Sequence, residues 1–392
     1  MFLSIACILI MGMFLGWLCK KIKLPALVGM LITGIILGPG VFNLIDSSIL
    51  NISAEIRKLA LIIILTRAGL ALDIKDLKRI GRPAIFMCFV PASFEIIGTI
   101  LLAPHFLGLT ILESALLGSV LAAVSPAVVV PRMVKLIEEG YGSNKSIPQL
   151  ILAGASVDDV FVIVFFSTFM SLSTGENANI LNFVNIPISI FLGIVIGLIL
   201  GYALSYYFKK IHMRDTVKVL IIISISCLLV YIEDQIKTPI NFSSLIAIMF
   251  LGIGLNKNRP IVARRLNQKY NKLWVLAEIL LFVLVGALVE IKCIPLIGIS
   301  SIIILLLALI FRMLGVFVSL IKTKLTINEK LFTMLSYTPK ATVQAAIGGI
   351  PLAAGLSCGQ TILTIAVIAI LITAPIGGFL IDITYPKLLK KS

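Results

Sequence analysis

The sequence predicts an all-α polytopic membrane protein with thirteen transmembrane helices, arranged as two inverted repeats with two crossing broken helices. Three observations support this fold class: the composition is strongly apolar, positive charges alternate between successive loops, and prolines interrupt two apolar segments at corresponding places. Of the 392 residues, 59% are hydrophobic and 13% are charged, and the mean hydropathy is +1.13. A soluble domain has about twice this charged fraction, so the composition excludes one.

Thirteen apolar segments are long enough, or nearly long enough, to cross a hydrocarbon core about 30 Å thick. They comprise residues 2–18, 25–45, 56–72, 83–104, 111–137, 147–172, 184–208, 216–233, 241–255, 273–290, 294–321, 330–355 and 359–382. The ninth segment is short, and prolines interrupt the fifth and the twelfth. No basic stretch precedes the first segment, so we expect it to be retained rather than cleaved as a signal peptide.

Lysine and arginine residues alternate between the connections of these segments. One set of loops, together with the C-terminal tail, holds 26 of them, and the alternate loops hold only 4. Because basic loops stay on the cytoplasmic side, this pattern predicts a multi-pass protein of the cell (plasma or inner) membrane with its N-terminus outside and its C-terminus inside. The net charge of +15 is thereby explained by topology, and no nucleic-acid partner is expected.

Two adjacent carboxylates, Asp158 and Asp159, lie within the sixth apolar segment. If a helix enters the bilayer near Ile147, Asp158 lies ~17 Å deep, near the midplane. An ionised carboxylate there costs at least a few kcal/mol, so the pair predicts an ion-binding and proton-carrying site. The alternative is a carboxylate pair that only holds helices together.

Other buried charges lie at a similar depth. Glu95 in the fourth segment and Arg312 in the eleventh both fall near the midplane, and we expect them to form a structural ion pair, because either charge alone would be uncompensated. Glu278 lies about one turn inside the tenth segment, as a possible entrance to the site or as an interfacial residue.

The fifth and twelfth segments are predicted to be broken helices. Ser125-Pro126 lies centrally in one, and Thr338-Pro339-Lys340 in the other. Proline removes a helix hydrogen bond, and such a break is tolerated at this depth only where other groups satisfy the backbone. A simple proline kink is the alternative for either segment alone.

The two breaks predict an inverted repeat, because segments seven apart cross the membrane in opposite directions. Segments one to six then match eight to thirteen, and Pro126 and Pro339 are 213 residues apart. Adding this offset to Glu95 gives position 308, one turn from Arg312. The corresponding regions are scaffold helices in 1–82, core helices in 83–173, a linker with scaffold helices in 174–293, and core helices in 294–392.

The broken helices direct half-helix ends, with their partial charges, at the bilayer centre. We expect Lys340 to neutralise carbonyl ends there, in preference to contacting the substrate. Ser125 and Thr338 are expected to cap the freed amides.

Four sequence blocks, considered together, resemble the monovalent cation:proton antiporter superfamily and, within it, the NHA branch of sodium/proton antiporters. The blocks are Arg67–Asp73 (RAGLALD), Ser125–Pro131 (SPAVVVP), Asp158-Asp159 and Lys340–Gly348 (KATVQAAIG). The resemblance implies an NhaA-like antiporter fold, a homodimer, and an elevator-like movement of a core formed by segments four to six and eleven to thirteen. It also implies that Asp158 and Asp159 carry the ion and the proton, and that the branch has an arginine at Arg312 with a partner at Glu95.

The residue types are consistent with exchange of Na⁺ or Li⁺ for H⁺. These hard cations prefer oxygen ligands, which Asp158 and Asp159 provide, with Ser156 and Ser125 as possible additional ligands. A cation binds only after the carboxylate loses its proton, so cation and proton compete for one site. No cofactor is expected beyond the transported ions, and since a guanidinium does not deprotonate, the exchange is expected to be electroneutral.

Other functions remain open. A K⁺/H⁺ antiporter and a sodium-coupled solute symporter of the same fold are the closest alternatives. A channel is disfavoured because nothing resembles a filter of carbonyls or a ring of charges. An intramembrane aspartyl protease needs two carboxylates facing each other from different helices, whereas these are adjacent on one, so we expect no enzyme.

Overall fold

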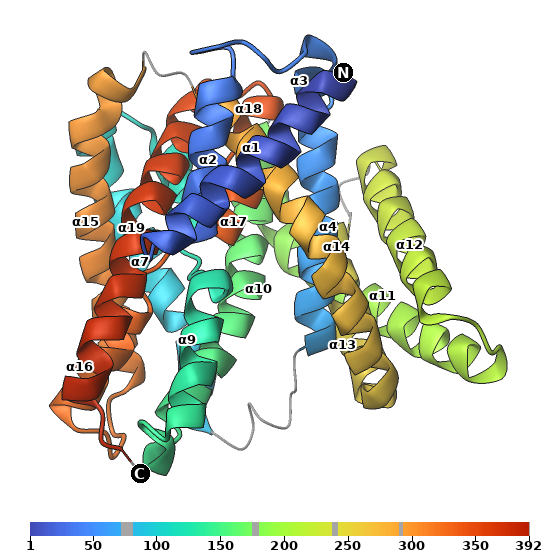
Figure 1. The fold of residues 1–392 in the computed structure, drawn as a ribbon. Coiled ribbons are helices and arrows are strands. Elements are labelled where there is room, and N and C mark those ends of the chain that lie inside the picture. Colours follow the sequence, from blue (N-terminus) through green and yellow to red (C-terminus); the bar gives the residue numbers. More distant parts are fainter. Residues whose placement is uncertain (72–80, 175–179, 237–241, 290–292, 392) are drawn as a thin grey trace. The chain divides into compact units, whose positions relative to one another are not determined.

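In the computed structural model, the described residues are 1–71, 81–174, 180–236, 242–289 and 293–391, except for the side chains of 156, 160, 180–187 and 293–297 (Figure 1). This part of the chain is helical and divides into two compact units. The larger unit comprises Met1–Ala54, Lys75–Ser173 and Ile279–Ser392, and the smaller comprises Glu55–Ile74 and Thr174–Glu278. The predicted division into four consecutive regions, namely 1–82, 83–173, 174–293 and 294–392, stays a prediction.

The larger unit holds most of the helices. They are α1 (Phe2–Lys21), α2 (Ala26–Leu37), α3 (Ser47–Asn51), α6 (Arg82–Met87), α7 (Val90–Leu107), α8 (Ile111–Leu121), α9 (Pro126–Glu139), α10 (Ile147–Thr174), α15 (Cys293–Ser319), α16 (Ile327–Ser336), α17 (Thr342–Ile347), α18 (Ile350–Ala353) and α19 (Gly359–Leu388). Helix α7 packs against α8 and α15, and α19 packs against α8, α9 and α15 to α18. The first helix begins at one end of this unit and the chain finishes at the other (Figure 1).

The smaller unit contains α11 (Ile180–Lys210), α12 (Asp215–Gln235) and α13 (Ser244–Asn258), with most of α4 (Ser53–Ala71) and the first two thirds of α14 (Pro260–Ala287). Helix α13 packs against both α11 and α12. The close contact with α11 depends on glycine: a Cβ atom at Gly197 would lie 2.3 Å from the Ala247 carbonyl oxygen.

Every predicted apolar segment contains helix in its described part, although residues 38–45 of the second segment and the two breaks are not helical. Within the described residues, nine helical stretches are long and apolar enough to cross a membrane, with α6 and α7 counted together as Arg82–Leu107 and α8 and α9 as Ile111–Glu139. Ala26–Leu37, Ser244–Asn258 and Thr342–Ala353 are shorter apolar helices. Helix α4, which carries several charges, belongs to neither group. The helical character of the segments is confirmed, while the count of thirteen crossings stays a prediction.

The two predicted breaks lie where the prolines indicate. Residues 122–125 separate α8 from α9, and residues 337–341 separate α16 from α17. The two breaks touch, because the Ser125 amide donates a hydrogen bond of 2.7 Å to the Pro339 carbonyl. Pro126 is the first residue of α9, a position at which a helix needs no amide hydrogen.

The expected capping of the breaks by Ser125 and Thr338 is wrong. The Ser125 side chain makes no capping hydrogen bond, and the Thr338 hydroxyl donates to the Leu335 carbonyl at 2.8 Å. The amide that a Ser125 cap would serve is already satisfied, because the Val128 amide donates to the Ser125 carbonyl at 3.2 Å. That leaves the Ser125 hydroxyl buried without a hydrogen-bond partner in the described part of the chain.

An ion pair fixes the turn before α10 to the start of α16. Lys145 Nζ lies 2.8 Å from Glu329 Oε2, and the buried Glu329 also accepts from the Thr326 amide at 2.7 Å. Burial alone raises the pKa of Glu329, but the hydrogen bonds from Lys145 and Thr326 outweigh it, so the pKa is lowered from its ordinary value. The pair therefore stabilises the fold at neutral pH, and this contribution is lost as the pH falls through that lowered pKa.

Candidate functional site

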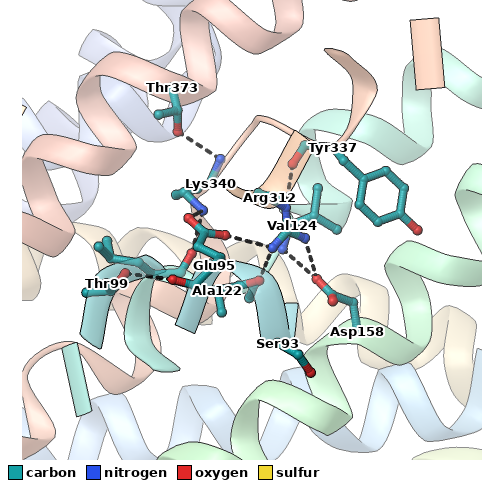
Figure 2. A network of polar contacts seen from close by, with 12 residues as sticks. Ser93, Glu95, Thr99, Ala122, Val124, Asp158, Arg312, Tyr337, Lys340 and Thr373 are labelled. Atoms are coloured by element: carbon teal, nitrogen blue, oxygen red, sulfur yellow. Dashed lines mark hydrogen bonds and ion pairs between the residues drawn. The ribbon is translucent and has the colours of Figure 1, made fainter. Parts of the chain in front are cut away.

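A fully buried arginine connects the elements around the crossing. Arg312, on α15, places Nη1 2.9 Å from Glu95 Oε2 on α7 and Nη2 2.7 Å from Asp158 Oδ2 on α10. Its Nε donates to the Tyr337 carbonyl at 2.7 Å, and Nη1 also donates to the Ala122 carbonyl. Figure 2 shows this guanidinium between the two carboxylates and the two breaks. Arg312 thus binds four separate segments of the chain.

Lys340 is the second buried cation of this network. Its Nζ lies 2.5 Å from Glu95 Oε1 and 2.5 Å from the Leu121 carbonyl oxygen to which it donates. Its backbone amide donates to Thr373 Oγ1 of α19 at 2.9 Å (Figure 2). Glu95 therefore has a cation at each of its two oxygens, and both cations are fully buried.

The carbonyl end of α8 is satisfied by side chains from other helices. Lys340 donates to Leu121, Arg312 to Ala122, and Gln344 Nε2 to Ala123 at 2.9 Å. A helix C-terminus carries partial negative charge and unpaired carbonyls, so two cations and an amide donor stabilise it at membrane depth.

Asp158 is fully buried, and its two oxygens differ. Oδ2 accepts from Arg312 and from the Val124 amide at 2.9 Å, whereas Oδ1 has no hydrogen-bond partner within the described residues. Ser125, the residue after Val124, has a buried hydroxyl that is likewise unsatisfied by the described groups. Two buried oxygens without donors are costly unless a proton or a cation binds them.

The charges of the printed ion pairs balance. Glu95 and Asp158 are matched by Arg312 and Lys340, and Asp159, the next residue on α10, is 6% exposed. A cation bound at the Asp158 oxygen that lacks a hydrogen-bond partner among the described residues would add one positive charge to this balanced network. The arrangement suits a site that exchanges one positive charge for another.

Comparisons with known proteins agree with this geometry. The family model described as "Sodium/hydrogen exchanger, transmembrane" matches residues 6–386. The chain belongs to the sodium/hydrogen exchanger family. It is 32% identical to human sodium/hydrogen exchanger 9B2, over 98% of this chain and 74% of that protein. It is 34% identical to mouse sodium/hydrogen exchanger 9B1, over 94% of this chain and 67% of that protein.

The fold is similar to that of the sodium proton antiporter MjNhaP1 from Methanocaldococcus jannaschii. The TM-score is 0.86 at 21% sequence identity, covering 98% of this chain and 97% of that one. The predicted all-α antiporter fold is thereby confirmed. Members of the exchanger family are transporters, in agreement with the prediction that the chain is not an enzyme.

The structure brings four of the predicted residues into one network, namely Glu95, Asp158, Arg312 and Lys340. Sequence reasoning missed the contact of Arg312 with Asp158, and it missed Gln344, a polar residue whose place in an apolar segment could have indicated it. The Ser156 side chain and Asp73 lie outside the described residues. Glu278 is partly buried on α14 in the smaller unit, and its role as an entrance stays a prediction.

A glycine on the aspartate helix accommodates a buried tyrosine. A Cβ atom at Gly154 would lie 1.9 Å from the Tyr337 hydroxyl and 2.9 Å from Met87 Cβ. The Tyr337 ring lies beside the guanidinium, with Arg312 Cζ 5.5 Å from its centroid. Gly154 therefore allows α10 to approach the break that precedes α17, so that Asp158, one turn later, reaches Arg312.

We expect Glu95→Gln and Arg312→Gln each to destabilise the protein by about 3–5 kcal/mol, because each leaves buried charges uncompensated. The double variant should recover part of the loss. Thermal unfolding in detergent measures this, with Glu138→Gln, an exposed carboxylate on α9, as the control. Strict additivity of the two single effects would contradict energetic coupling of the pair.

We expect Gly154→Ala to destabilise the protein by about 1–3 kcal/mol through overpacking against Tyr337. Tyr337→Phe removes the clashing oxygen and should restore part of this loss in the double variant, but not all, since Met87 remains close. Thermal unfolding of the two single variants and the double variant tests this. An unchanged cost of Gly154→Ala in the Tyr337→Phe background would show that the hydroxyl is not the obstacle.

Proposed function

We propose that the chain is a secondary active antiporter that exchanges Na⁺ or Li⁺ for H⁺ at Asp158 and Asp159. The observation that carries this proposal is the fully buried Asp158, with one oxygen held by Arg312 and Val124 and the other without a hydrogen-bond partner in the described residues. Membership of the sodium/hydrogen exchanger family supports it.

The available oxygens are consistent with a small monovalent cation. Asp158 Oδ1 and Ser125 Oγ are buried and unsatisfied by other described groups, and oxygen is the ligand atom that hard cations prefer. Asp159 is the second carboxylate of the proposed site, and Ser156 is a further candidate ligand. The cation binds the deprotonated site and the proton binds the same carboxylates, so the two compete. Competition combined with alternating access produces exchange.

In this proposal, the protein is a homodimer, and each copy has a core that contains the two touching helix breaks. This core moves like an elevator and carries the site from one side of the membrane to the other. The basic loops favour the plasma or inner membrane, with the N-terminus outside and the C-terminus inside.

The charge balance supports electroneutral exchange. Arg312 keeps its charge throughout, and Glu95 is stabilised as an anion by two cations. The proton carriers that remain are Asp158 and Asp159, and in this proposal one Na⁺ takes the place of one H⁺ on them. The simplest cycle therefore moves one proton against one cation.

We expect Asp158→Asn or Asp159→Asn, or both, to reduce exchange to background, because the amide keeps the shape and removes the charge that binds cation and proton. Asp234→Asn, an exposed carboxylate on α12, is the matched control and should retain exchange. Dequenching of a pH-sensitive dye in proteoliposomes, with Na⁺, Li⁺ and K⁺ in turn, measures this and tests the K⁺/H⁺ alternative. Normal exchange in both single variants would refute the site, and Na⁺-driven solute uptake without proton counterflow would favour a symporter.

We expect exchange to be insensitive to a voltage imposed with K⁺ and valinomycin, and to produce no transient current on solid-supported membranes. The reason is that one positive charge leaves the site for each one that enters. A sodium-evoked current that grows with voltage would contradict this. Lys340→Arg would then identify the source, since the current disappears if Lys340 releases the extra proton and persists if an aspartate does.

A further inference from the structure

The smaller unit contains a basic cavity far along the chain from the aspartate pair. It has a volume of about 360 Å³ and lies where α11 ends and where α12 and α14 begin. Its charged lining consists of Lys209, Arg214, Lys218, Arg259, Arg265 and Asp215. Five cations thus face one carboxylate in a confined space.

Asp215, the carboxylate of this lining, already forms ion pairs with two of the five cations. Asp215 Oδ1 lies 3.1 Å from Lys218 Nζ, and Asp215 Oδ2 lies 3.1 Å from Arg265 Nε. Lys218 is only 7% exposed at its side chain, so a buried cation forms part of the lining. Lys209, Arg214 and Arg259 have no ion-pair partner within the described residues and therefore leave an excess of positive charge.

The backbone adds to this excess. Arg214 is the N-cap of α12, and Arg259 stands immediately before the first residue of α14. Both helices are long, and a helix N-terminus carries partial positive charge that favours anions and disfavours nearby cations. Two arginines at two such ends are unfavourable for stability by themselves, and a bound anion would reverse their effect.

We propose that this cavity binds a phosphate-bearing anion. Arginine side chains match phosphate oxygens geometrically, and the volume accommodates a phosphate group with a small polar substituent. The headgroup of an anionic phospholipid is favoured as its source. Exposed apolar residues also lie along α12, at Val217, Leu220, Leu228 and Tyr231, and offer acyl chains a surface on the helix that begins at the cavity.

The test compares two triple variants that remove the same charge. Lys209→Gln/Arg214→Gln/Arg259→Gln changes the lining, whereas Lys210→Gln/Lys257→Gln/Arg264→Gln changes exposed residues nearby that do not line the cavity. Titration of the purified full chain with dioctanoyl phosphatidic acid, followed by thermal shift and native mass spectrometry, measures binding. Dioctanoyl phosphatidylcholine and inorganic phosphate are the comparison ligands.

We expect the lining variant to bind phosphatidic acid on the order of 100-fold more weakly, at about fivefold per charge, and the control variant to bind it like the unmodified protein. The charge-preserving Lys209→Arg/Arg214→Lys/Arg259→Lys should retain binding, which separates loss of charge from loss of fold. Binding of phosphatidic acid without inorganic phosphate identifies a lipid headgroup, and binding of phosphate alone identifies a soluble anion. Equal weakening in the lining and control variants, or no binding of either ligand, would overturn the proposal. None of these measurements depends on transport.

Discussion

The larger unit depends on how one buried guanidinium is neutralised. Arg312 is fully buried, and it contacts two carboxylates and two backbone carbonyls from different parts of the chain. A buried charge is tolerated only where its partners are held in place, since loss of one partner costs several kcal/mol. Helices α7, α8, α10, α15 and α16 must therefore meet at this point.

The two helix breaks follow from the same requirement. An intact helix uses its carbonyls in its own hydrogen bonds. Because α16 ends at Ser336, the Tyr337 carbonyl can accept from Arg312. Because α8 ends at Leu121, the carbonyls of residues 121–123 can accept from the side chains of Lys340, Arg312 and Gln344. The prolines create free backbone groups, and the buried cations and Gln344 satisfy them. Each feature would be destabilising without the other.

Much of this site could be predicted from single residues and their depth. Helical rise placed Glu95, Asp158 and Arg312 at one level, and the offset between Pro126 and Pro339 related the two halves. Depth specifies one coordinate only, so it could not predict that Arg312 also binds Asp158. The predicted caps were wrong because backbone groups take the expected roles: the Val128 amide bonds to the Ser125 carbonyl, and the Thr338 hydroxyl bonds to the Leu335 carbonyl.

The expectation of electroneutral exchange was argued from Arg312 alone and did not consider Lys340 as a proton carrier. Lys340 contacts a carbonyl end, as the sequence suggested, but it also pairs with Glu95, and a lysine can release a proton where an arginine cannot. The contacts argue against such release: Glu95 Oε1 faces Lys340, so a neutral Lys340 would leave two carboxylates to Arg312 alone. Protonation of Glu95 would instead leave two buried cations with Asp158 as the only carboxylate in their ion-pair network. Both changes unbalance this network. A proton on Asp159 leaves the ion pairs of Arg312 and Lys340 unchanged, and a cation at Oδ1 of Asp158 keeps that carboxylate charged and paired with Arg312.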